Sequence, residues 1–77
     1  MKAIDFNGLC FFQQMEMVLK GTRLAKRDAG RYYIYLYNVC EFYVEVFYDA
    51  GTDIIKHMKA FSGTRQLAPY IEEIVIS

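Results

Sequence analysis

The segment RYYIYLYNVCEFYVEVFYD, residues 31–49, constrains the fold more than any other part of the chain. It holds six of the seven tyrosines, and residues of similar type recur at every second position. That period is typical of β-strands, whose successive side chains point to opposite faces of a sheet. Turn residues at 28–30, 39–41 and 50–52 interrupt the pattern. We therefore predict a meander of four antiparallel strands at 22–27, 31–38, 42–49 and 53–61.

Helical spacing appears in the sequence before and after the predicted strands. Leu9, Phe12, Met15 and Leu19 recur at intervals of three and four residues, which indicates an amphipathic helix over 5–20 that ends before Gly21. The C-terminal residues LAPYIEEI suggest a short closing helix after Thr64. The predicted fold is a single α+β domain over 1–77, with the N-terminal helix packed on the sheet.

The register of the strands decides which side chains share a face. Hairpin loops of three residues set Leu36 opposite Val44, Ile34 opposite Val46 and Tyr32 opposite Tyr48, which makes one apolar face for the helix to cover. Two-residue loops would instead set Leu36 against Tyr43 and mix Val44 with Tyr35, which sorts the residues less cleanly. We adopt the three-residue loops.

In that register the opposite face carries large aromatic side chains, and one helix cannot cover both faces. A contiguous aromatic patch of more than a few hundred Å² marks an association surface, although aromatic residues also have a high strand propensity and tolerate partial exposure. Glu45 would lie beside His57 in this patch. The predicted partner-binding residues are Tyr33, Tyr35, Tyr37, Tyr43, Glu45, Phe47 and His57.

Composition excludes several classes of function. Nine basic and nine acidic residues cancel to a formal charge of zero, which argues against a partner held mainly through phosphates. Cys10 and Cys40 have no His or Cys neighbours at the spacing of a zinc site, and we expect two reduced thiols in a cytoplasmic protein. No apolar run reaches the roughly 18 residues that a membrane span needs, so we expect no membrane partner.

We expect no catalytic residues, metal site or cofactor. His57 is the only histidine, and a row of Tyr35, Glu45 and His57 would lack a nucleophile. Gly30, Gly51 and Gly63 are isolated, so the chain has no glycine-rich phosphate loop. The chain is therefore predicted to be non-enzymatic.

Two segments resemble a group of short uncharacterised bacterial proteins. The first is FYVEVFYD at Phe42–Asp49, and the second is LAPYIE at 67–72. The resemblance covers the C-terminal half to two thirds of the chain. In that group the central turn tends to be Asp-Gly, whereas this chain has Cys40-Glu41. The resemblance implies no activity.

Two functional hypotheses follow from these observations. The first is an interaction module that self-associates or binds a protein through the aromatic face, since Tyr, Phe and Arg are common at such surfaces. The alternative is single-stranded nucleic-acid binding, because sheet tyrosines can stack on bases. That alternative would use a basic cluster of Lys20, Arg23, Lys26, Arg27 and Arg31.

Overall fold

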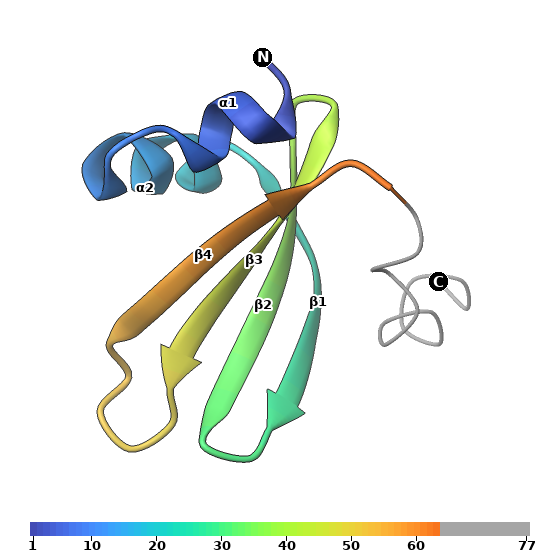
Figure 1. Ribbon diagram of the computed structural model, residues 1–77. Helices are drawn as coiled ribbons and strands as arrows, with labels where there is room; N and C mark the ends of the chain where they lie inside the picture. Colours follow the sequence, from blue (N-terminus) through green and yellow to red (C-terminus); the bar gives the residue numbers. More distant parts are fainter. Residues whose placement is uncertain (64–77) are drawn as a thin grey trace.

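The computed structural model describes residues 1–63, which form two short helices followed by a four-stranded sheet (Figure 1). The helices are α1 (Ala3–Asn7) and α2 (Phe11–Leu19). The strands are β1 (Thr22–Ala29), β2 (Tyr32–Val39), β3 (Phe42–Asp49) and β4 (Ile55–Phe61). All neighbouring strands are antiparallel in the order β1-β2-β3-β4, so the α+β class and the meander are confirmed. The predicted C-terminal helix lies outside the described residues.

The N-terminal helix is divided in two, where one continuous helix was expected. Gly8 ends α1, and its N–H donates to the carbonyl oxygen of Asp5 at 3.2 Å. Cys10 adopts an extended conformation and begins α2, with its N–H directed at Oε1 of Gln13 at 3.4 Å. Glycine is a poor residue inside a helix, so the break falls at the residue that least favours continuation.

The loops of the first two hairpins contain two residues, so the predicted three-residue loops are wrong. Ala29 pairs with Tyr32 and Val39 pairs with Phe42, which leaves Gly30-Arg31 and Cys40-Glu41 as the loops. The first residue of each loop has a positive φ, 67° at Gly30 and 52° at Cys40. Positive φ at this position is typical of the tight turns that match the twist of a hairpin.

The shorter loops shift the register by one residue. Leu36 lies opposite Glu45, and Tyr37 lies opposite Val44. The expected pairing of Leu36 with Val44 is therefore wrong, and so is its alternative of Leu36 with Tyr43. A shift of one residue in one strand exchanges the faces of all its side chains relative to the neighbouring strand.

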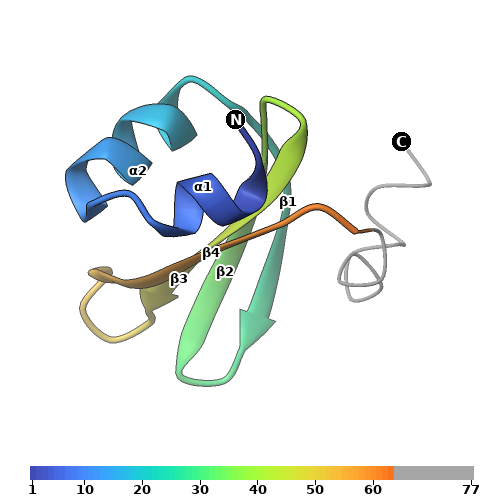
Figure 2. The ribbon, with the colours of Figure 1, turned by 45° about the horizontal axis from the view of Figure 1, so that its top comes forward.

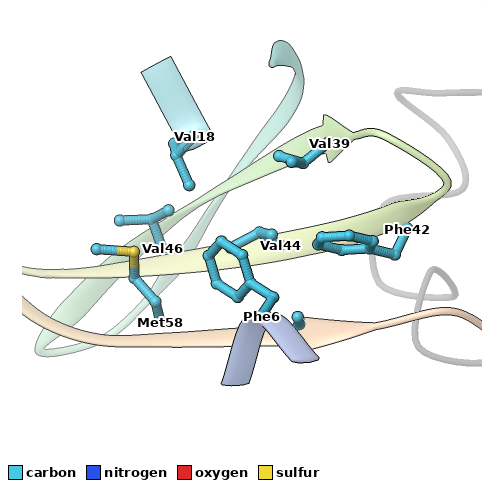
Figure 3. Packing of buried hydrophobic residues seen from close by; sticks show 8 residues of the cluster. Phe6, Val18, Val39, Phe42, Val44, Val46 and Met58 are labelled. Carbon is cyan, nitrogen blue, oxygen red and sulfur yellow. The ribbon is translucent and has the colours of Figure 1, made fainter. Parts of the chain in front are cut away.

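The helices cover one end of one face of the sheet (Figure 1). Phe6 of α1 and Val18 of α2 are buried there against β2, β3 and β4, and the Phe6 and Phe42 rings lie 5.6 Å apart (Figure 3). Asn7 adds two hydrogen bonds to the backbone of Ala60 on the edge strand β4. The buried sheet residues of this core are Val39, Phe42, Val44, Val46, Met58 and Ala60.

A second, smaller core lies on the other face of the sheet. Ile34 and Leu36 are almost completely buried, and they cluster with Ala25 and Phe61. Tyr43 and Phe47 pack against this cluster. The residues predicted to form one apolar face are thus divided, with Leu36 in this cluster and Val44 beneath the helices.

Candidate interaction surface

The structure places the predicted partner-binding residues on two opposite faces. Side chains that lie directly opposite each other on neighbouring strands share a face. Tyr33, Tyr35 and Tyr37 pair with Tyr48, Val46 and Val44, so they lie on the face that carries the helices. The other predicted residues lie on the opposite face, on β3 and β4: Tyr43, Glu45, Phe47 and His57.

Four tyrosines form a contiguous cluster, which we call the tyrosine patch: Tyr33, Tyr35, Tyr37 and Tyr48. All four are half-buried. They lie on the face that carries the helices, and the end of the sheet nearest the first and third hairpin loops is not covered by α1 or α2 (Figures 1 and 2). Tyr48 was missed because the assumed register placed it on the opposite face.

The rings of the patch hold one another in a fixed arrangement. Tyr33 and Tyr48 are stacked, with centroids 5.0 Å apart and an interplanar angle of 3°. Tyr35 meets the edges or faces of both rings at 5.6 and 5.4 Å and contacts Tyr37 at 6.5 Å. Offset and edge-to-face pairs of this kind contribute about 0.5–1.5 kcal/mol each beyond the burial of area. The patch is therefore ordered before any partner arrives.

Two cations of β1 border the patch. The guanidinium carbon of Arg23 lies 5.0 Å from the centroid of the Tyr35 ring. Nζ of Lys26 lies 5.2 Å from the Tyr33 centroid and 6.0 Å from that of Tyr35. An open hollow of about 380 Å³ lies beside them, lined by Arg23, Leu24, Ala25, Lys26 and Tyr35. A partner seated on Tyr35 would therefore meet positive charge on the β1 side.

One phenol of the patch is tied to a carboxylate. The hydroxyl of Tyr33 donates a hydrogen bond of 2.7 Å to Oδ1 of Asp53, in the loop before β4. This hydrogen bond, together with partial desolvation and the negative charge of Asp53, raises the pKa of Tyr33 to about 12. Burial, and then the neighbouring Tyr37 and Tyr35, raise the pKa of Tyr48 as well. In both groups the shift favours the neutral phenol over the phenolate.

The predicted contact between Glu45 and His57 is wrong. Glu45 pairs with Lys59 across β3 and β4, while His57 pairs with Phe47. The imidazole of His57 packs on the Phe47 ring, with centroids 5.3 Å apart. Glu45 is 7% exposed, and its Oε2 lies 3.6 Å from a guanidinium nitrogen of Arg27. The row of Tyr35, Glu45 and His57 therefore does not exist.

The described residues show no arrangement that would hold a metal. Among residues 1–63, no group of three or more His, Cys, Asp or Glu side chains is placed to coordinate an ion. Cys10 and Cys40 are both exposed and free. In the same part of the chain, no helix has the length and apolar character needed to cross a membrane.

Comparison of the chain with protein-family models, curated proteins and solved structures yields no match. The resemblance of Phe42–Asp49 to short bacterial proteins therefore stays a prediction. Evidence on function comes from the geometry of the described residues alone.

Proposed function

We propose that the chain is a non-enzymatic interaction module that binds a protein partner through the tyrosine patch. The observation that carries this proposal is the position of the four rings. They are contiguous, half-buried and in mutual contact: Tyr37 and Tyr48 pack against the core beneath the helices, while Tyr33 and Tyr48 lie near the ends of β2 and β3 that adjoin the first and third hairpin loops, an end of the sheet that neither α1 nor α2 covers. Tyrosine is a common anchor at protein interfaces because it supplies a large contact area at a low cost in conformational entropy.

The cations on β1 indicate the chemistry of the partner. Arg23 lies over the Tyr35 ring, so a carboxylate of the partner could pair with its guanidinium while apolar groups of the partner rest on the phenol rings. The Tyr33 hydroxyl is already committed to Asp53. We therefore propose a partner segment that combines acidic and apolar side chains.

A selection experiment tests this proposal. The parent chain would be used to select binders from a displayed library of random peptides, and affinities would then be measured for the Tyr35→Ala and Tyr32→Ala variants. Tyr32 is a matched control, because it is more exposed than the patch tyrosines and lies on the other face of the sheet. We expect Tyr35→Ala to weaken binding by about tenfold or more and Tyr32→Ala to leave it unchanged. Binders that respond equally to both substitutions would refute the proposal.

Single-stranded nucleic acid is a second candidate ligand. The specific observation in its favour is that Glu45 lies on the opposite face and Arg23 and Lys26 border the patch. Two carboxylates, Asp28 and Asp53, nevertheless lie beside Tyr33. Against it stand the zero formal charge and the stacking of Tyr33 on Tyr48, which already occupies ring faces that bases would need. Fluorescence anisotropy of labelled oligonucleotides at low and moderate salt decides between the two, since an absence of binding at low salt removes this candidate.

We also propose a cytoplasmic location. The support is chemical: both cysteines are exposed free thiols, which persist in a reducing compartment.

A further inference from the structure

The second helix presents an apolar stripe away from the protein interior. We call it the α2 stripe and define it as Phe11, Phe12 and Leu19. At about 100° per residue, these three positions fall within an arc of roughly 100° on one side of the helix. Their exposed fractions are 55%, 70% and 74%.

The adjoining side of the helix faces the sheet. Val18 is buried in the main core, and Met15 and Met17 pack against that core. Nε2 of Gln14 donates a hydrogen bond of 3.0 Å to the carbonyl oxygen of Phe6. Phe12 and Leu19 are seven residues apart and therefore lie in line along the helix, outside these contacts.

We propose that the α2 stripe is the contact surface between two copies of this chain. In the proposed homodimer, two α2 helices pack antiparallel about a two-fold axis near Met15 and Glu16. This arrangement sets Phe12 of each copy against Leu19 of the other, so a single stripe is complementary to itself. The surface is separate from the tyrosine patch, which lies on β2 and β3.

The area is sufficient for a stable dimer. A large apolar side chain has about 150–250 Å² of surface, so Phe11, Phe12 and Leu19 together expose roughly 400 Å² at the fractions given above. Two copies would bury roughly 800 Å² of apolar surface. Because about 60% of a typical interface is apolar, this corresponds to roughly 1,300 Å² in total, within the range of specific interfaces.

Charge favours a second copy over an anionic lipid surface. Helices that lie on such membranes carry Lys and Arg on the polar face. Within Phe11–Leu19 the only charged residue is Glu16, and Lys20 at the C-cap is the single cation of the helix, too few to hold an anionic lipid surface. The formal charge of the chain is zero, so two copies do not repel each other at long range. The two Glu16 carboxylates near the axis are exposed, so solvent and salt weaken their mutual repulsion.

Sedimentation equilibrium of the full chain over a range of protein concentrations tests the proposal. We expect a monomer–dimer equilibrium whose dissociation constant rises about tenfold or more in Phe12→Ser and in Leu19→Ser, because each substitution acts twice in a symmetric interface. The matched control is Ile54→Ser, an equally drastic change at an exposed apolar residue in the β3–β4 loop. Far-UV circular dichroism verifies that each variant is folded.

A disulfide experiment tests the symmetry without relying on a destabilising change. In a Cys10→Ser, Cys40→Ser background, Glu16→Cys would lie near the two-fold axis and should form a covalent dimer with an oxidised glutathione buffer. Gln13→Cys, on another side of the same helix, should not. The glutathione disulfide accepts the two electrons released as the two thiols join.

Three results would overturn the proposal. The first is a monomer at every concentration. The second is a dimer that is weakened by Tyr35→Ala and unaffected by Phe12→Ser, which would assign self-association to the tyrosine patch. The third is cosedimentation of the chain with phosphatidylserine vesicles that Phe12→Ser abolishes while the chain in solution stays monomeric. Because peptide binding is measured with Tyr35 variants, failure of this proposal leaves the proposed function standing.

Discussion

The hydroxyl of Tyr33 and the carboxylate of Asp53 join the tyrosine patch to the loop before β4 through a hydrogen bond of 2.7 Å. Asp53 has a positive φ of 60°, a conformation that Asp and Asn adopt more readily than most residues. The same loop is fixed by its own backbone, since the Asp53 N–H donates to the carbonyl oxygen of Asp49 at 2.7 Å. The loop conformation thus positions the acceptor for the phenol.

The raised pKa of Tyr33 predicts a loss of stability at alkaline pH. The folded pKa of about 12 exceeds the ordinary tyrosine pKa of about 10, so the neutral phenol is favoured in the folded state. The stabilisation linked to this group is complete below the unfolded pKa, and it is lost as the pH rises toward the folded one. We expect Asp53→Asn to lower the pKa of Tyr33 while keeping the turn, because asparagine also tolerates positive φ.

NMR titration of tyrosines labelled at Cζ measures this pKa directly, and Tyr33→Phe assigns the resonance. The control is Asp28→Asn, which removes a carboxylate from the residue that pairs with Tyr33 across β1 and β2. Equal Tyr33 pKa values in the parent and Asp53→Asn would show that the hydrogen bond does not control the titration.

Cys40 is predicted to destabilise its hairpin. Its φ of 52° lies in the left-handed region, where a residue with a Cβ loses about 1–2 kcal/mol. Glycine removes that strain, although its greater freedom in the unfolded chain costs about 0.5–1 kcal/mol. We therefore expect Cys40→Gly to raise the free energy of unfolding by about 0.5–1 kcal/mol.

Urea denaturation compares Cys40→Gly with the reverse change, Gly30→Ala. Gly30 occupies the equivalent loop position with φ 67°, and an added Cβ would meet no atom within 4 Å. We expect Gly30→Ala to lower the free energy of unfolding by about 1 kcal/mol, and because the added Cβ meets no atom, this change would report backbone conformation alone. A less stable Cys40→Gly variant would mean that the thiol makes a contact that outweighs the strain.

The strands could be predicted from the sequence, because alternation of β-branched and aromatic residues survives any choice of register. The register itself could not. A two-residue loop at Cys40-Glu41 requires a positive φ at a cysteine, and no Gly or Asn marks that turn. The three-residue loop was adopted because it sorted the apolar residues onto one face, whereas the observed pairing of Val39 with Phe42 places both side chains in the main core. Burial in the core therefore prevailed over local propensity.

The wrong register also led to a wrong set of residues for the candidate surface. Tyr33, Tyr35 and Tyr37 were recognised because they alternate within one strand, which needs no register. Assigning Tyr48 to them needs the pairing of β2 with β3, since Tyr48 lies directly opposite Tyr33. The break between α1 and α2, by contrast, was marked in the sequence by Gly8 and could have been predicted from that residue.

The ion pair between Arg27 and Glu45 should contribute to stability even though the arginine is partly exposed. The Glu45 side chain is 9% exposed and the Arg27 side chain 33%, with nitrogen and oxygen 3.6 Å apart. Arg27→Met removes a cation from beside a nearly buried carboxylate, and we expect it to cost about 1–3 kcal/mol, after allowance for solvent at the arginine.

A double variant, Arg27→Met with Glu45→Leu, provides the contrast. Glu45 faces Leu36 in the second core, so leucine there is an apolar group in apolar surroundings. We expect the double variant to regain most of the stability lost in Arg27→Met, as seen when buried ion pairs are replaced by packed apolar groups. Urea denaturation near neutral pH measures both. A double variant no more stable than Arg27→Met would contradict this account.

Asn7 is predicted to protect the outer edge of the sheet. Its Nδ2 donates to the carbonyl oxygen of Ala60 at 3.2 Å, and its Oδ1 accepts from the Ala60 N–H at 3.0 Å, so the amide satisfies two backbone groups of the edge strand β4. Each hydrogen bond contributes about 0.5–1.5 kcal/mol, and we expect Asn7→Ala to cost about 1–2 kcal/mol. Asn38→Ala, which removes a single hydrogen bond to the carbonyl oxygen of Phe42, should cost about half as much.

Native-state hydrogen exchange gives the decisive test: the Ala60 amide should lose protection in Asn7→Ala by more than the change in global stability explains. Unchanged relative protection at Ala60 would show that another group shields this edge.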